Sequence, residues 1–348
     1  ATSNRIFFTA PTVVEQFTGN TGWYMSMVSN AVTIGFFVFI YLLLKRFPGK
    51  DILEIFHISF GRLIGFLLSF AYALSFLAAC GILLREFFEM LKIYILPDTP
   101  ISVLNGTMVI IVAVAVFLGL EAIARTARLT AYFVLFGYLI LLILSSEFFK
   151  VANLFPILGY GIGNTVIQGV TRSSAYSEVI ILAVFAGSLQ GARHIKKAGF
   201  LSLILSGLLV SAGILCMALI FPYYTSQEQT APLYTLATLI RYGTFFQRLD
   251  PAFLFLWIIV TVISGSIVFY CAVSSYCKTF RLQDRRPVII PMAVLLFAVT
   301  MVPRDLPSVI TQYIELLRVY PIFLFFIIPL VALITAVLRK KKGADDAC

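Results

Sequence analysis

The sequence predicts an all-α polytopic membrane protein with ten transmembrane helices, and three observations predict this class. Apolar residues occupy 60% of the 348 positions and the mean hydropathy is +0.99, more apolar surface than a soluble domain of this size can bury. Apolar runs of about twenty residues, the length that crosses a bilayer, recur along nearly the whole chain. Lys and Arg gather in every second loop between these runs.

The expected helices follow in chain order, each placed to within a few residues. The first is a stretch over residues 5–17 that is too short to cross a bilayer, so we expect the N-terminal half of this helix to be missing. Two amphipathic pieces join the spans: residues 51–60 at the cytoplasmic interface, and residues 231–242 outside, as either a pathway cap or a surface helix. The full spans are expected at 23–44, 63–84, 102–120, 129–145, 162–189, 200–221, 251–271, 288–302 and 320–338.

The distribution of basic residues predicts the orientation. Most of the 26 Lys and Arg lie in the loops 45–62, 125–128, 193–197 and 278–286 and in the tail 339–348, which we therefore place in the cytoplasm. The formal net charge of +10 then reflects membrane topology and contact with anionic lipids on the cytoplasmic side. Nucleic-acid binding is a poor interpretation, because the charge is split among short loops.

Two of the helices contain residues that interrupt a membrane helix. In the first, Pro11 removes a backbone donor beside the polar Thr9, which predicts either a broken helix or an ordinary kink. In the sixth, Gly169 and the polar run 171–174 fall in the middle of the span. Arg172 and Glu178 each cost about 3 kcal/mol at a bilayer centre, so we expect them to face a wet or paired interior.

The two interruptions lie five spans apart, so the halves 1–149 and 150–338 of a single transmembrane domain would insert with opposite topology. Interrupted helices at matching positions of two inverted halves point to a binding site at the membrane midplane. The N-termini of the half-helices would suit an anion such as an amino-acid carboxylate. A milder interruption, Ser264-Gly265-Ser266 in the eighth span, is interpreted as either a break or a site of close helix packing.

Ten residues are candidates for contact with a small ligand. Glu178 ranks first, because a carboxylate just past the break could bind an amino group, a cation or a proton; an ion pair that locks the helix is the alternative. Hydroxyl side chains near the breaks would offer hydrogen bonds, and the two aromatic residues either face the cavity or serve packing. The candidates are Thr9, Tyr72, Ser75, Thr171, Arg172, Ser173, Ser174, Ser177, Glu178 and Trp257.

No catalytic or metal-binding pattern is recognisable. His57 and His194 belong to no triad, the five Cys have no metal-ligand spacing, and no phosphate-binding loop is present. We therefore expect neither an enzyme nor a cofactor.

Eight short motifs occur in the order and on the sides of the membrane that are typical of one family. The chain resembles the GerAB-type spore germination permeases, the B subunits of germinant receptors, within the amino acid–polyamine–organocation superfamily. It departs from the family at Asn4-Arg5, where small residues are usual, and at Gly187, where Pro is usual. The motifs are Thr9-Ala10-Pro11, Arg46 to Lys50 with Leu53-Glu54-Ile55, Leu84 to Phe87, Leu96 to Pro100, Gly119 to Arg125, Asn153 to Pro156, Ser174 with Glu178, and Phe245 to Asp250 with Trp257.

The resemblance implies a fold and a function. The fold would be two inverted five-helix repeats, as in LeuT-type transporters. The protein would reside in the inner spore membrane of a bacterium, beside a receptor A subunit and a lipoprotein C subunit, and would recognise a small germinant, often an amino acid. An ion-coupled secondary amino-acid transporter of the same fold is the alternative, and a scaffold with a vestigial pocket is a third hypothesis.

Overall fold

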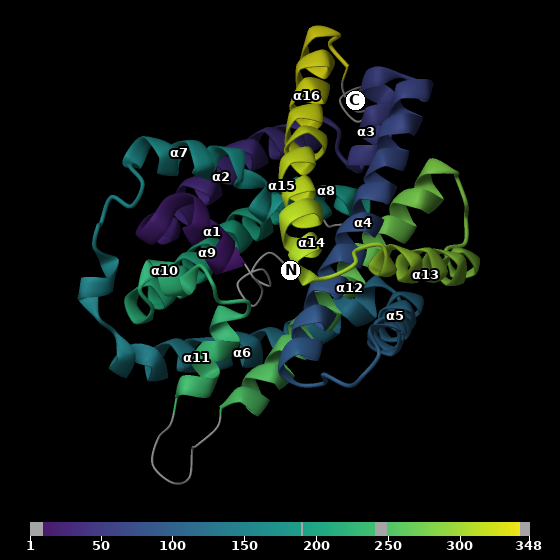
Figure 1. Ribbon diagram of the computed structural model, residues 1–348. Coiled ribbons are helices and arrows are strands. Elements are labelled where there is room, and N and C mark those ends of the chain that lie inside the picture. The colour runs from purple at the N-terminus through teal and green to yellow at the C-terminus, as the bar shows by residue number, and fades with distance from the viewer. Residues whose placement is uncertain (1–9, 189–190, 241–248, 342–348) are drawn as a thin grey trace.

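The computed structural model describes residues 10–188, 191–240 and 249–341, and the regular elements in these ranges are all helices (Figure 1). Seven helical runs are long and apolar enough to cross a membrane. A further apolar helix, α13 (Arg286–Met301), has only 16 residues. The seven runs are Thr12–Arg46, Arg62–Tyr94, Ile101–Leu118, Leu120–Phe148, Arg193–Ile220, Asp250–Thr279 and Leu306–Leu338.

Most predicted spans coincide with one helix of the structure. The ten expected spans are not all found as continuous helices of spanning length, because the sixth is broken and the ninth, α13, is short. The spans predicted at 63–84, 102–120, 129–145, 200–221 and 251–271 correspond to α4 (Arg62–Tyr94), α5 (Ile101–Leu118), α6 (Leu120–Leu144), α9 (Ala192–Ile220) and α12 (Asp250–Thr279).

A tight turn joins the first and second predicted spans, whereas the interruption predicted at Pro11 lies at the edge of the described residues, which begin at Ala10. Helix α1 (Ala10–Thr18) is followed by a single 3₁₀ turn, η2 (Gly19–Thr21), and then by α2 (Gly22–Arg46). Gly19 adopts a φ of +66°, a left-handed conformation that residues with a side chain rarely adopt. A Cβ on Gly22 would lie 2.8 Å from Val14 Cγ1, so the chain folds back and α1 packs beside the start of α2.

The last span begins earlier than expected. We predicted its start at Tyr320, but the helical run begins at Leu306 and continues through α14 (Leu306–Ser308), α15 (Glu315–Pro321) and α16 (Ile328–Leu338). Two π-helical stretches, η7 (Val309–Ile314) and η8 (Ile322–Ile327), separate these segments. The charges of Glu315 and Arg318 make the sequence resemble a loop there, but the two side chains pair with each other, at 3.3 Å between Nη1 and Oε1.

The eighth span is continuous, so of its two interpretations the break does not occur. Helix α12 runs continuously through Ser264-Gly265-Ser266. A Cβ on Gly265 would already touch Leu84 of α4 and Val112 of α5, at 3.3 and 3.4 Å. Cys80 of α4 also donates a hydrogen bond to the Gly265 carbonyl at 3.4 Å. The small residues therefore allow close helix packing, the second of the two interpretations.

A short helix outside the spans packs against the ends of membrane helices. As predicted, residues 51–60 form a short helix, α3 (Ile52–Phe60), and Asp51 caps it by accepting hydrogen bonds from the amides of Leu53 and Glu54. Lys278, at the end of α12, donates to Asp51 Oδ2 at 2.6 Å. The outer piece predicted at 231–242 forms a helix over Pro232–Leu239, α11.

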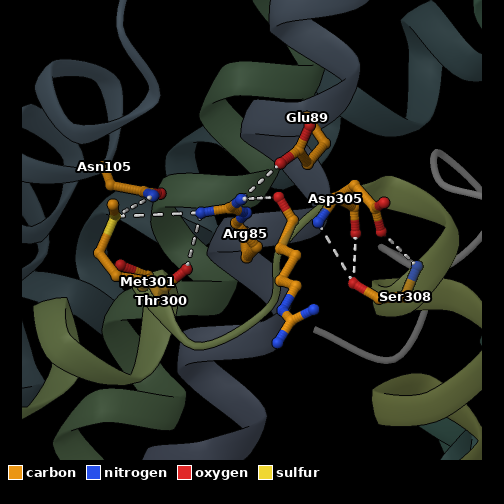
Figure 2. Close-up of polar contacts among 8 residues, drawn as sticks. Arg85, Glu89, Asn105, Thr300, Met301, Asp305 and Ser308 are labelled. Atoms are coloured by element: carbon orange, nitrogen blue, oxygen red, sulfur yellow. Dashed lines mark hydrogen bonds and ion pairs between the residues drawn. The ribbon is translucent and has the colours of Figure 1, made fainter.

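A buried arginine ties α4 to the turn before the last span (Figure 2). The predicted span ended at residue 84, but α4 extends past Arg85, whose side chain is only 4% exposed. It donates to the carbonyls of Thr300 and Arg304 and forms a 2.7 Å ion pair with Glu89. These contacts fix the turn after α13, which leads into the last span.

The same turn ends in a capping box. The Asp305 carboxylate accepts a hydrogen bond from the Ser308 amide at 2.9 Å, and the Asp305 amide donates to the Ser308 hydroxyl (Figure 2). The bonds from Ser308 lower the pKa of Asp305 from its ordinary value, because they stabilise the carboxylate. This cap fixes the start of α14.

Candidate functional site

The predicted break in the sixth span is present. Helix α7 (Ile162–Thr171) is followed by its C-cap residue Arg172, and the chain continues as a 3₁₀ helix, η5 (Ser173–Ile180). Two short elements follow, α8 (Ile181–Val184) and η6 (Ala186–Ser188). A change from α to 3₁₀ geometry in mid-span leaves backbone carbonyls without their helical partners, and inside a membrane other groups of the protein must satisfy them.

Hydroxyl groups of α2 supply these partners. Ser29 donates to the carbonyl of Gly169 at 2.8 Å, and Thr33 donates to the carbonyl of Ser173 at 2.9 Å. Ser26, one turn earlier on the same face, lies 2.7 Å from the hydroxyl of Tyr176. The three hydroxyls, spaced along one face of α2, therefore hold both sides of the break.

Close packing of α7 on α2 depends on a glycine. A Cβ on Gly169 would lie 2.7 Å from Cγ1 and 2.9 Å from Cβ of Val28, closer than real contacts. We expect Gly169→Ala to lower the free energy of unfolding by about 1 to 3 kcal/mol, because α7 must shift away from α2. Gly163→Ala, in the same helix with no atom within 4 Å of its Cβ, is the matched control. Thermal unfolding in detergent measures both, and equal midpoints would contradict the interpretation.

Arg172 forms an ion pair within the protein. Its Nη1 lies 2.8 Å from Glu315 Oε1 of the last span, and its Nε donates to Gln168 at 3.1 Å. The guanidinium also lies over the ring of Phe17, 3.7 Å from its centroid. Glu315 is shared with Arg318. Arg172 is thus paired between the sixth and the last span, in line with the expectation of a wet or paired interior.

A cavity of about 620 Å³ lies beside the break. Its walls come from α4, η5, α12 and the last span, and they are mostly apolar. The polar side chains in the lining include Ser75 and Glu86 from α4, Ser177 and Glu178 from η5, and Ser264 from α12. The volume falls within the range typical of sites for small ligands, and a few polar groups in an apolar lining are typical of such sites.

The structure brings three of the ten candidates together at this cavity: Ser75, Ser177 and Glu178. Two others lie next to it and bond to the last span, because Tyr72 donates to the Leu324 carbonyl at 3.0 Å and Ser174 donates to the Arg318 carbonyl. Both acceptors belong to residues that line the cavity.

The remaining candidates lie elsewhere. Trp257 is fully buried and packs on Phe87 and Phe253. Thr171 is exposed and donates to the Ile167 carbonyl of its own helix. Ser173 is buried, and its carbonyl accepts the bond from Thr33. Thr9 and the departure at Asn4-Arg5 lie outside the described residues.

Several residues of this region were not anticipated. Glu86 and Ser264 line the cavity, and Arg318 contributes to its wall. A charge within a long apolar helix could have indicated Glu86 as a site residue. The predicted span ended at residue 84, so Glu86 was not considered part of the helix. Within the described stretches, no three His, Cys, Asp or Glu side chains gather as metal ligands would.

Comparison with known proteins gives a consistent result. Residues 5–309 match the Spore_permease family, which is described as "Spore germination protein". Three proteins of Bacillus subtilis (strain 168) are similar over most of the chain, and 88% of each relative is covered. Spore germination protein KB is 26% identical over 93% of this chain, spore germination protein B2 is 24% identical over 93%, and spore germination protein A2 is 23% identical over 90%.

Proposed function

This chain belongs to the spore germination permease family, and from that premise we propose that it is the nutrient-sensing membrane subunit of a germinant receptor. It is a multi-pass integral membrane protein of the germination-receptor type. The cavity beside the broken sixth span is the proposed site for a small germinant. The observation that carries this proposal is the position of Ser177 and Glu178, which the break places in the wall of the cavity.

The lining suits an amino acid. Glu178 could accept hydrogen bonds from an ammonium group, and the hydroxyls of Ser75 and Ser177 add polar contacts. The apolar walls from α4 and the last span would surround the side chain of the ligand. Because Glu178 lines the cavity, a charged group inside the cavity could lie beside it.

The proposal includes the arrangement implied by the family. The halves 1–149 and 150–338 would be inverted five-helix repeats of the LeuT type, with the first and sixth helices interrupted. The break after Arg172 in the sixth helix supports this arrangement. A receptor A subunit and a lipoprotein C subunit would be the partners, in the inner spore membrane.

A ligand screen tests the function. Purified protein is heated in the presence of amino acids, sugars or nucleosides, and a specific ligand should raise the unfolding midpoint. We expect Glu178→Gln to weaken the binding of an amino acid by about 10-fold or more, because a charge-assisted hydrogen bond becomes a neutral one. Glu121→Gln, at an exposed pair far from the cavity in sequence and outside its lining, is the control.

Two outcomes would contradict the proposal. If none of these compounds shifts the midpoint, the chain alone is not the sensor. If the purified protein in liposomes accumulates a labelled amino acid along an ion gradient, the alternative of a secondary transporter is favoured.

A further inference from the structure

The cavity has a mouth on the lipid-facing surface of the protein. Four of its lining residues are half or more exposed: Leu74 (50%), Leu316 (52%), Tyr320 (64%) and Phe323 (56%). Leu74 belongs to α4 and the other three to the last span, both of which are long and apolar enough to cross the membrane. Exposed residues of such spans face the hydrocarbon of the bilayer.

This mouth lies deep in the bilayer. Leu74, Tyr320 and Phe323 are near the middle of their spans, each 33 residues long. A helix of that length measures about 50 Å, whereas the hydrocarbon core is about 30 Å thick. The middle of both helices therefore lies within the hydrocarbon, close to the plane where the ends of the acyl chains meet.

The backbone of the last span is distorted at the mouth. The π-helical stretches Val309–Ile314 and Ile322–Ile327 flank α15, which ends at Pro321. Such stretches shift side chains from regular helical positions and often mark functional sites. The carbonyl of Arg318 accepts a hydrogen bond from Ser174, and the carbonyl of Leu324 accepts one from Tyr72. Side chains of the sixth span and of α4 thus supply hydrogen bonds to the distorted backbone.

An apolar surface continues from the mouth into the protein. Phe76, Ile82, Val268 and Phe325 line the cavity and are at most 6% exposed. The polar Ser177 and Ser264 are also buried, at 3% and 2%, and belong to η5 and α12, which contribute none of the four mouth residues. An apolar cavity stays dry and favours apolar occupants, which gain contacts that an empty cavity lacks.

From these observations we infer that the end of a membrane-lipid acyl chain enters the cavity between α4 and the last span and occupies its apolar part. The occupant is the hydrocarbon of the bilayer itself, because the lining is continuous with the lipid-facing surface. A germinant would then compete with a lipid chain for this space. The inference uses the cavity of the proposed function, and its test requires no germinant.

Photolabelling from the bilayer tests the inference. The full chain is placed in lipid nanodiscs that contain a phospholipid with a diazirine at the end of its acyl chain, irradiated, and mapped by mass spectrometry. We expect label on Ser264 and Val268 of α12, which are buried from the outer surface, as well as on the mouth residues.

Two variants and a control identify the route. Ala79→Phe fills the cavity from its α4 wall, and Leu74→Trp narrows the mouth with an exposed side chain that should not disturb folding. Both should abolish the label on α12 and leave the label on Phe323. Ala115→Phe, a half-buried position of α5 outside the lining, should change nothing.

Label confined to the mouth in the wild type, or label on α12 that both variants leave unchanged, would overturn the inference. Label confined to the mouth would mean that polar ligands occupy the interior or that a helix of a partner protein covers the mouth. Failure of this experiment does not affect the ligand screen, and a negative ligand screen does not affect the labelling.

Discussion

Glu315→Gln is expected to lower the free energy of unfolding by about 3 kcal/mol, because it removes a carboxylate charge that pairs with two buried guanidinium groups. Arg172 and Arg318 share the Glu315 carboxylate, at 2.8 and 3.3 Å, and their side chains are only 10% and 8% exposed. The Glu315 side chain is 30% exposed, so solvent screening keeps the expected loss at the lower end of the range for buried pairs.

Glu121→Gln is the matched control for this measurement. Glu121 pairs with Arg125 at 2.5 Å, but both side chains are more than three-quarters exposed, and such pairs contribute little. Thermal unfolding in detergent should show a clear drop for Glu315→Gln and almost none for Glu121→Gln. Similar midpoints for the two variants would show that the buried cluster does not hold the sixth span to the last one.

Ser29→Ala combined with Thr33→Val is expected to cost about 2 to 5 kcal/mol of unfolding free energy. Ser29→Ala takes the hydroxyl donor from the buried carbonyl of Gly169, which costs about 1 to 3 kcal/mol, and Thr33→Val removes a second hydrogen bond, to the carbonyl of Ser173, which is worth about 0.5 to 1.5 kcal/mol. Val has nearly the shape of Thr, so at position 33 the loss reports mainly on the hydrogen bond. The carbonyls concerned belong to Gly169 and Ser173.

Thr107→Val provides the comparison for this double variant. Thr107 is exposed and donates only to the Val103 carbonyl of its own helix at 2.9 Å, so its loss should be nearly neutral. Hydrogen exchange adds a local readout, and we expect the double variant to exchange faster over residues 169–180. Unchanged exchange there would mean that the hydroxyls of α2 do not support the break.

The spans and the break could be predicted from the sequence because their signals are local. Apolar runs of sufficient length mark α4, α5, α6, α9 and α12, and Asp51 before an amphipathic piece marks α3. Gly169 with the polar run after it marks the end of α7. Each of these features depends on residues close together in the chain.

The start of the last span and the pairing of charges could not be predicted in this way. Arg172 and Glu315 are 143 positions apart, and only the packed structure shows that they meet. Taken alone, Glu315 and Arg318 look like loop residues. The burial of Arg85 was missed for the same reason, since its partners Thr300, in the last turn of α13, and Arg304, on the turn after it, are distant in the chain.

The cavity also depends on packing between distant segments. Ser75, Ser177 and Ser264 lie on three different elements, and nothing in their spacing indicates a shared wall. Glu178 could be proposed alone, because a carboxylate within a membrane span is costly unless it has a role.

The most direct test of the account is the position of a bound germinant. A cryo-electron-microscopy map of the protein with the ligand found in the screen should show density between α4, η5, α12 and the last span. We expect ligand atoms within about 4 Å of Ser177 and Glu178, the distance of direct contact. Density for the ligand elsewhere on the chain, with this cavity unchanged, would contradict the account.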